Sequence, residues 1–186
     1  MPMKADLWFP TVIWNDHLKD VNNTEIKEYV EKLAEEDKVG KVASNYGGWQ
    51  SKSFELLDQK PLAIERFIHT LQRCLNECTK MAGMPDLIIS DWWWNINYHK
   101  DYNQPHNHRD SVLSGVYYID VPEDSDSKIH FDREDEAQYY LPRYMPQRNQ
   151  ITAVRATYTP LNNNVLIFPS WVIHYVDGNK SQKPRL

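Results

Sequence analysis

The chain has 186 residues and a formal net charge of −5, with 21 Lys and Arg against 26 Asp and Glu. This length suits one domain, which we expect to span residues 1–186 around a single core. The acidic balance, without a basic run, argues against nucleic acid as a partner. No apolar run approaches membrane-spanning length and the N-terminus has no secretory signal, so we expect a soluble cytoplasmic protein without a membrane partner.

Aromatic residues and cysteines narrow the class further. The sequence has 7 Trp and 11 Tyr beside only 6 Gly, and many of the rings fall in strand-like stretches, which favours a β-rich core. Cys74 and Cys78 are four residues apart in a helical pattern and have no Cys or His cluster nearby. We therefore expect free thiols on or beside an apolar helix face, with no zinc site.

The first half of the chain predicts one short strand and two helices. Residues 7–14 form a strand-like run broken at Pro10, which indicates an edge strand because proline donates no ladder hydrogen bond. The first helix begins near Asn22, a favourable capping residue. Residues 44–51 are rich in turn formers and are expected to form no regular element. A stronger helix follows over residues 62–81.

After this second helix the pattern changes from helical to alternating, which predicts strands. The expected strands are residues 87–98, 112–121, 128–131, 151–159, 164–168 and 171–176. Residues 132–150 form a polar, proline-containing excursion, for which an ordinary surface loop and a mobile lid near a site are both open. Helices followed by strands predict an α+β fold, with the helices packed on one face of an antiparallel sheet.

Three histidines form the most informative pattern. His106 and His108 are one residue apart, and alternate side chains of a β-strand share a face, so both imidazoles could reach one metal ion. His174 lies far downstream in a second strand-like run, a gap too long for a zinc finger but suited to two strands that meet across a barrel or sandwich. The pattern predicts a metal site, while imidazole ligands alone suit zinc, iron, copper and nickel.

Arg185, eleven residues beyond His174, adds an anion anchor. A guanidinium stays protonated and offers a rigid fork that matches a carboxylate. The combination indicates a co-substrate that chelates the metal at one end and reaches the arginine at the other. Because Arg185 is the penultimate residue and chain ends fray unless they are tied down, we expect this anchor to be mobile and its affinity for the anion to be low.

Several short motifs occur in one order along nearly the whole chain. They are Phe9-Pro10, Asn45-Tyr-Gly-Gly-Trp-Gln-Ser51, Trp93-Trp-Asn95, His106-Asn-His108, Ser114-Gly-Val-Tyr-Tyr118 and Phe168-Pro-Ser-Trp171. Each motif is weak alone, but the order is specific. In this respect the chain resembles the 2-oxoglutarate/iron(II)-dependent oxygenases of bacteria and phages, which belong to the prolyl-hydroxylase-like double-stranded β-helix superfamily.

The resemblance implies a double-stranded β-helix (jelly roll) with two N-terminal supporting helices. It implies Fe(II) held by His106, His108 and His174, 2-oxoglutarate as co-substrate and ascorbate as a reductant. The expected reaction is oxidative decarboxylation of 2-oxoglutarate to succinate and carbon dioxide, coupled to hydroxylation of an unidentified small molecule or peptide. The residues implied for 2-oxoglutarate are Arg185, Tyr118, Ser114 and Asn97, and those for the substrate are Asn95 and Trp171.

Several alternatives stay open. The superfamily uses a carboxylate as its second ligand, and a shifted set of His108, Asp110 and His174 would supply one. A cupin-type metal enzyme without 2-oxoglutarate also pairs His-x-His with a distal His, although the Glu expected a few residues later is missing. A non-enzymatic jelly-roll binding module, for example in a phage particle, is a third hypothesis.

The primary substrate and the assembly are not fixed by the sequence. Four acidic residues of the excursion, Asp132, Glu134, Asp135 and Glu136, indicate either a basic substrate or an ordinary solvated charge run. A homodimer is open, and the resemblance places the protein in the cytoplasm of a bacterial cell or of a phage-infected host.

Overall fold

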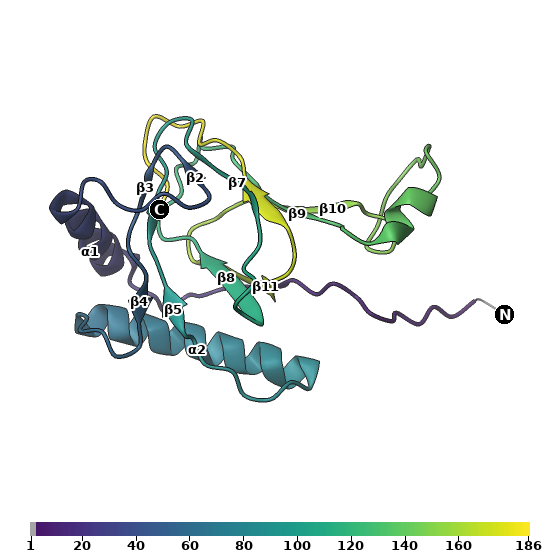
Figure 1. The fold of residues 1–186 in the computed structure, drawn as a ribbon, viewed down its shortest axis with the longest axis horizontal. Helices are drawn as coiled ribbons and strands as arrows, with labels where there is room; N and C mark the ends of the chain where they lie inside the picture. Colours follow the sequence, from purple (N-terminus) through teal and green to yellow (C-terminus); the bar gives the residue numbers. More distant parts are fainter. Residues whose placement is uncertain (1–2) are drawn as a thin grey trace.

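The computed structural model, which describes residues 3–186, is built mostly of β-strands with two helices beside them (Figure 1). The helices are α1 (Asn23–Glu36) and α2 (Leu62–Ala82), and a short 3-10 helix, η1, covers Glu136–Tyr140. The strands are β1 (Trp14–His17), β2 (Asn45–Tyr46), β3 (Trp49–Gln50), β4 (Phe54–Glu55), β5 (Asp91–Trp92), β6 (Asn95–Ile96), β7 (Tyr102–His106), β8 (Leu113–Tyr117), β9 (Ile129–Asp132), β10 (Arg155–Tyr158), β11 (Asn164–Pro169) and β12 (His174–Val176).

The strands form two main antiparallel sheets. One has the order β1-β11-β8 and the other the order β10-β9-β12-β7-β2, while β3 with β6 and β4 with β5 form two small pairs. Buried side chains from both main sheets meet in one cluster, which includes Phe168 of β11, Phe131 of β9 and Tyr118, the residue that follows β8. The two sheets therefore pack face to face around a common core, as in a sandwich.

Helix α2 covers the other face of the three-stranded sheet. Its Cys78 packs with Val165 and Ile167 of β11, and its Phe67 ring lies 4.8 Å from the Tyr117 ring of β8. Cys74 and Cys78 are both free thiols, and Cys78 is buried, as the helical spacing predicted. The sheet is thus buried on one face by α2 and on the other by the second sheet.

Local capping residues mark one end of each helix. The Asn22 side chain accepts a hydrogen bond from the Thr24 N–H and caps α1. Gly83 ends α2 in a left-handed conformation, with φ +64°, and Met84 N–H returns to the Thr79 carbonyl. Periodicity and capping were sufficient here because the signals are local.

The expectation of no regular element over residues 44–51 is wrong. Asn45 and Tyr46 form β2, which pairs with β7, whereas Trp49 and Gln50 form β3, which pairs with β6. Gly47 and Gly48 connect them with φ of +69° and +65°. A Cβ on Gly48 would lie 2.6 Å from the Ile96 carbonyl oxygen, so the turn formers are confined to a tight connection between two sheets.

The strand predicted over residues 87–98 is also wrong as a single element. It is divided into β5 and β6 because Trp94 leaves the ladder: its N–H donates to the Ser51 hydroxyl and its carbonyl accepts from the Ser51 N–H. Likewise, no strand covers residues 7–13; β1 starts at Trp14, although it does lie at a sheet edge. The strands predicted at 112–121, 128–131, 151–159 and 164–168 correspond to β8 through β11 with shifted ends.

The C-terminus is not frayed, which corrects the expectation of a mobile Arg185. The Arg185 and Asn97 backbones exchange two hydrogen bonds of 2.9 Å, and Leu186 N–H donates to the Asp120 carbonyl at 2.9 Å. The Leu186 carbonyl accepts in turn from the Ile119 and Asp120 N–H groups. Pairing on both sides ties the last two residues into the fold, which spacing along the chain could not show.

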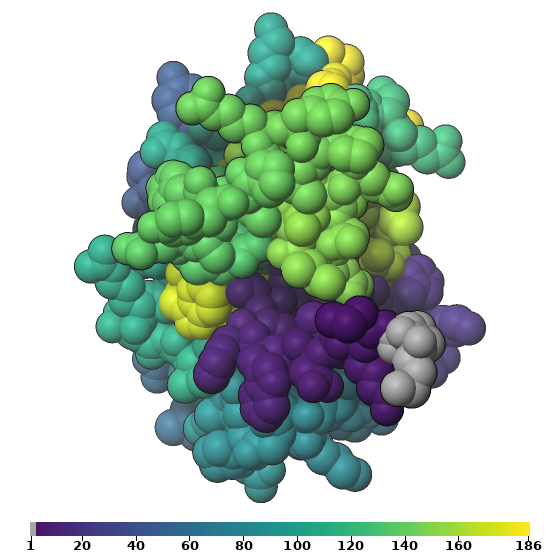
Figure 2. Space-filling model, turned by 90° about the vertical axis from the view of Figure 1, so that its right-hand side faces the viewer, coloured from purple at the N-terminus to yellow at the C-terminus, as the bar shows by residue number. Residues whose placement is uncertain are grey.

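Two segments project from the same end of the molecule. They are residues 3–12, which are exposed throughout, and the excursion between β9 and β10, which carries η1 and the exposed Tyr139 and Tyr140 (Figure 1). Figure 2, which looks onto this end, shows both segments on one face of the molecule. Among residues 3–186, no helix combines the length and apolar character that a membrane crossing requires.

Candidate metal centre

Three imidazole rings meet where the five-stranded sheet ends. His106 and His174 are paired across β7 and β12, and their ring centroids are 4.3 Å apart. The His108 ring lies 5.0 Å from that of His106 and 5.2 Å from that of His174. One nitrogen from each ring lies within 4.8 Å of the others, so the three could hold one metal ion.

His108 reaches this cluster from outside a strand. β7 ends at His106, so strand alternation does not place His108, contrary to the expectation from the His-x-His spacing. Instead the His108 N–H donates to the Ser170 carbonyl at 2.9 Å, and the imidazole packs against the Trp93 ring, 5.5 Å between centroids. The loop after β7 is therefore tied to the loop before β12, next to His174.

Hydrogen bonds fix which ring nitrogen faces the cluster. The Nδ1 of His106 lies 2.7 Å from the Gln104 carbonyl, and the Nδ1 of His174 lies 3.0 Å from the Val172 carbonyl. A carbonyl only accepts, so both Nδ1 atoms carry the proton and both Nε2 atoms keep a free lone pair. Backbone carbonyls that orient histidines in this way are typical of metal ligands.

The cluster is held in the neutral, metal-competent state. Burial lowers the pKa of His174 to about 4, helped by the neighbouring His106 and His108 and opposed by the Val172 carbonyl. Burial likewise lowers the pKa of His106 and His108. Neutral imidazoles are the form that binds metal, because protonation removes the lone pair.

The alternative ligand set with Asp110 is not assembled. Asp110 is exposed in the turn that precedes β8, and among residues 3–186 the group that could hold a metal comprises only His106, His108 and His174. A ligand set moved two residues along the chain, from His106 to Asp110 as partners of His108, would need the strand to continue. The chain instead leaves the β7 ladder at His106 and turns before β8.

A cavity of about 990 Å³ is lined by residues of both main sheets, among them the three histidines, and also by residues of α2. His106, His108 and His174 line one part of it, and Tyr118 and Arg185 line another. The register of β7 and β12 separates the two parts, since His106 and His174 lie at one end of these strands and Asn103 and Val176 at the other. Asn103 in turn contacts Asn97, whose backbone pairs with that of Arg185.

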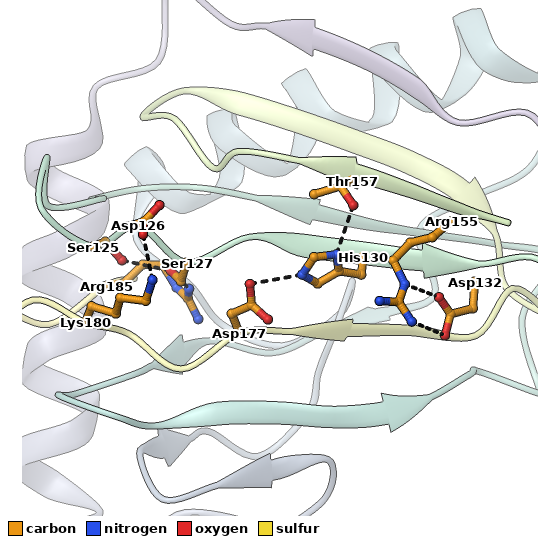
Figure 3. A network of polar contacts seen from close by, with 10 residues as sticks. All are labelled: Ser125, Asp126, Ser127, His130, Asp132, Arg155, Thr157, Asp177, Lys180 and Arg185. Atoms are coloured by element: carbon orange, nitrogen blue, oxygen red, sulfur yellow. Dashed lines mark hydrogen bonds and ion pairs between the residues drawn. The ribbon is translucent and has the colours of Figure 1, made fainter. Parts of the chain in front are cut away.

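Arg185 is a buried cation without a carboxylate partner. Its residue is 3% exposed, and none of the ion pairs within residues 3–186 includes it. One guanidinium N–H donates to the Ser127 hydroxyl (Figure 3). Burial lowers the pKa of Arg185, whereas Tyr118 and Asp177 raise it. A desolvated cation of this kind favours an anion as its partner.

The Tyr118 hydroxyl is a second unsatisfied group in the same cavity. It is buried and has no hydrogen-bond partner within the described chain. Burial raises the pKa of Tyr118, so the phenol keeps its proton and acts as a donor. A buried donor without an acceptor is costly, and an acceptor on a bound molecule would relieve that cost.

The other residues singled out in the sequence divide into two sets. Ser114, Asn97 and Asn95 line the cavity, and the Asn95 side-chain oxygen is buried without a partner. The Ser114 hydroxyl already bonds to that of Ser170 at 2.7 Å. Trp171 does not line the cavity; its side chain is 55% exposed.

Sequence reasoning missed several residues of this region. Asn103 lines the cavity from β7 and bonds to Asn97, Trp93 packs against His108, and Ser127 contacts Arg185. The Trp-rich motif was noticed only as part of a resemblance. Ser127 carried no signal, because it lies 58 residues from Arg185 and serine is common in loops.

Comparisons with known proteins agree with this architecture. A family model described as "Putative 2OG-Fe(II) oxygenase" matches residues 91–186, just over half of the chain. A crystal structure of a Pseudomonas putida prolyl-4-hydroxylase is similar with a TM-score of 0.64 and 11% identity, over 94% of this chain and 88% of that one. The comparison with curated proteins gives no match.

A second solved structure is equally similar. It is the non-haem alpha-ketoglutarate-dependent carbocyclase SnoK from nogalamycin biosynthesis, with a TM-score of 0.64 and 13% identity over 94% of this chain and 76% of that one. At these identities the two likenesses show the fold alone, which is of the jelly-roll type.

Fold, imidazole cluster and family model together define an oxidoreductase of the non-haem iron class. The chain belongs to the 2-oxoglutarate- and iron(II)-dependent oxygenase family, and it uses Fe(II) and 2-oxoglutarate. The residues present fit both groups: two oriented Nε2 atoms and a third imidazole suit the ion, and the orphaned Tyr118 hydroxyl beside a buried, unpaired Arg185 suits a carboxylate.

Proposed function

We propose that the protein is a hydroxylase whose iron is held by His106, His108 and His174. In the proposed reaction, 2-oxoglutarate, dioxygen and a substrate C–H group give succinate, carbon dioxide and the corresponding alcohol. Bound iron would supply the dioxygen chemistry at the coordination positions that three protein ligands leave free. The substrate is a small molecule or a peptide, and ascorbate serves as a reductant that keeps the metal ferrous.

This proposal rests on one observation: a group of metal-binding nitrogens and a group of carboxylate-binding donors line the same cavity. At one end the Nε2 atoms of His106 and His174 offer lone pairs to a metal ion; at the other, the Tyr118 hydroxyl has no acceptor and Arg185 has no carboxylate partner. A dicarboxylic 2-oxo acid satisfies both, with its distal carboxylate on Arg185 and the Tyr118 hydroxyl. Asn97, which pairs with Arg185 through its backbone, lies beside that carboxylate.

The charges support a dianionic co-substrate. The metal-holding group contains no carboxylate, so Fe(II) and Arg185 would bring three positive charges into a largely buried space. Two carboxylates of 2-oxoglutarate offset most of that charge. This compensation would make binding of the ion and of the 2-oxo acid mutually favourable.

The remaining roles concern orientation and exclusion of water. Phe131 and Phe168 pack against the His174 ring from the core side and shield it from solvent. Ser114 and Asn95 supply polar contacts along the cavity wall, the first to 2-oxoglutarate and the second to the substrate. We propose no binding role for Trp171, because it is not among the residues that line the cavity and is largely exposed.

We also infer the finer architecture, a double-stranded β-helix with α1 and α2 as supports. Two facing antiparallel sheets and the packing of α2 on the outer face of β11 favour it. The excursion between β9 and β10 leaves the sheet one residue after Phe131, which pairs with His174, and this position is consistent with a lid. Its acidic run gives little support to a basic substrate, because Arg155 pairs with Asp132 at 2.6 Å and Arg133 with Asp135 at 2.8 Å.

The test is release of succinate from 2-oxoglutarate under air with Fe(II) and ascorbate. Wild-type protein should release succinate even without a substrate, at a slow uncoupled rate. The His174→Ala variant should not, while Asp110→Ala, which removes an exposed carboxylate two residues beyond His108, should behave as wild type.

Three outcomes separate the competing functions. Succinate release that depends on His174 supports the oxygenase. Metal binding without binding of 2-oxoglutarate by calorimetry would favour a cupin-type enzyme. If the folded protein binds neither metal nor 2-oxoglutarate, the remaining hypothesis is a jelly-roll binding module, and the proposal is wrong.

A further inference from the structure

A closed, buried polar network contacts the Arg185 guanidinium through Ser127. It joins Ser125, Ser127 and Asn179, which come from two loops and are at most 2% exposed (Figure 3 draws the two serines with Arg185). Ser127 contacts the guanidinium, Ser125 lies 2.8 Å from Ser127, and Asn179 lies 2.8 Å from Ser125. Buried groups of this kind must be fully paired, so the direction of each hydrogen bond can be worked out.

The orientation of Asn179 is fixed by backbone groups. Its Nδ2 donates to the Asn97 carbonyl at 3.0 Å and to the Lys183 carbonyl at 2.8 Å. Its Oδ1 accepts from the Ser181 N–H at 3.2 Å. The amide cannot be reversed, because its oxygen would then face two carbonyl oxygens. Oδ1 is therefore the atom that faces Ser125, and it can only accept.

The orientation of Asn179 also fixes which serine hydroxyl donates and which accepts. Since Asn179 accepts from Ser125, the single hydroxyl hydrogen of Ser125 is used, and its oxygen must accept from Ser127. The hydrogen of Ser127 is then also used. Its oxygen is left as an acceptor for the Arg185 N–H, which is the only role that suits a guanidinium. The network thus presents Arg185 with an oxygen that cannot rotate into a donor.

We propose that Ser127, held in this state by Ser125 and Asn179, is a positioning residue that aims Arg185 at 2-oxoglutarate. This inference rests on the proposed function. Arg185 has five N–H donors in a planar fork, and its bond to Ser127 restricts the rotation of that fork. The cavity-facing donors are thereby pre-oriented, so less conformational entropy is lost when the carboxylate binds.

The same two loops also carry a surface contact that serves as a matched control. Lys180 pairs with Asp126 at 2.6 Å, but both side chains are exposed (Figure 3). An exposed pair contributes little to stability. Its removal disturbs the loops on the solvent side without touching the buried network, so it separates loop stability from the positioning of Arg185.

The experiment measures binding of 2-oxoglutarate to the Mn(II)-loaded protein by calorimetry, in wild type and in Ser127→Ala, Ser127→Thr and Lys180→Ala. We expect Kd to rise about tenfold in Ser127→Ala, the loss of one charge-assisted hydrogen bond. Ser127→Thr, which keeps the hydroxyl, should restore most of the affinity, and Lys180→Ala should remain within about twofold of wild type. In turnover, KM for 2-oxoglutarate should rise in Ser127→Ala while kcat at saturation changes far less.

A second readout needs neither metal nor co-substrate. In nitrogen-15 NMR spectra of the ligand-free protein, the Arg185 guanidinium hydrogens should be resolved from one another in wild type, because rotation is hindered, and should merge in Ser127→Ala. If Ser127→Ala does not fold, Ser125→Ala gives the same test in weaker form, with about a threefold rise in Kd, because it frees the Ser127 hydrogen to rotate.

The outcomes distinguish this inference from the proposed function. If wild type binds 2-oxoglutarate and Ser127→Ala binds it equally well, or if Lys180→Ala weakens binding as much, the positioning role is wrong and the oxygenase stands. If wild type does not bind 2-oxoglutarate at all, the proposed function fails and the positioning role fails with it, whatever the NMR spectra show.

Discussion

The two ends of the cavity are built in opposite ways. The end that contains Arg185 is closed: backbone hydrogen bonds pair the last two residues with Asn97 and Asp120, and the polar network around Ser127 is buried. The end that contains the three imidazoles is open: His108 lies in the loop after β7, and the excursion with the exposed Tyr139 and Tyr140 leaves β9 one residue after Phe131, which pairs with His174. The Arg185 end is held by buried hydrogen bonds, whereas the imidazole end is bordered by exposed loops.

This difference matches the two tasks of such an enzyme. A co-substrate that is common to the whole family needs a rigid, dry anchor, since each fixed donor reduces the entropy lost on binding. A substrate that differs between members is better bound by loops, because loops tolerate sequence changes that leave the core intact. The contrast predicts which substitutions affect iron, which affect 2-oxoglutarate and which affect neither.

The largest effect is expected at the open end, on iron. His106→Ala removes one of the three proposed ligands and should weaken iron binding by at least about a hundredfold, since even changes behind a ligand cost 10–100-fold. Asp110→Ala should retain iron, because that carboxylate is exposed and outside the cluster. Metal analysis after gel filtration decides; full retention in His106→Ala with loss in Asp110→Ala would restore the shifted ligand set.

The next effect is expected at the closed end, on 2-oxoglutarate. Arg185→Gln should raise the Kd of the Mn(II)-loaded protein about a hundredfold, because the proposed charged contact with the carboxylate is lost, and should leave metal content unchanged. Arg155→Gln is the control: Arg155 pairs with Asp132 on the outer sheet face, away from the cavity. Equal Kd values in Arg185→Gln and wild type would show that Arg185 does not bind 2-oxoglutarate.

A smaller effect is expected from pH in the metal-free protein. His174 has its pKa lowered by burial to about 4, below its unfolded value of 6.5, so the folded state binds fewer protons between these values. Stability is therefore complete above pH 6.5 and falls as the pH drops towards 4, by up to about 3 kcal/mol for this group. Urea unfolding after chelator treatment measures it; a His174→Gln variant should show a shallower decline, and equal slopes would contradict the assignment.

The smallest effect is expected from the excursion. None of residues 134–150 is buried, so their replacement by a short Gly-Ser linker should change the free energy of unfolding by less than about 1 kcal/mol. The Kd for 2-oxoglutarate should stay within about twofold, because Arg185 lies at the other end. Urea unfolding and calorimetry check both; a large loss of either would mean that the excursion is part of the closed structure rather than a lid.

The sequence predicted what depends on local pattern. Both helices, the free thiols on α2 and the strands from β8 to β11 follow from periodicity and capping. The three histidines were found because side-chain chemistry and spacing indicated a metal, and the resemblance to the oxygenase family added iron and 2-oxoglutarate. The single-domain interpretation stays a prediction, and the oligomeric state stays open.

The sequence could not predict what depends on long-range pairing. β2 and β3 were missed because each strand has two residues and finds its partner about fifty residues away. The rigidity of Arg185 was missed for the same reason: its backbone partner is Asn97 and its side-chain partner is Ser127. Chain position alone indicated a frayed end, and tertiary hydrogen bonds reversed that prediction.

The most direct test of the central claim is a crystal structure of the protein with Mn(II) and 2-oxoglutarate under nitrogen. We expect one metal ion on His106, His108 and His174, with the distal carboxylate of 2-oxoglutarate on Arg185 and the Tyr118 hydroxyl. A metal bound by Asp110, or a 2-oxoglutarate whose distal carboxylate lies away from Arg185, would contradict it.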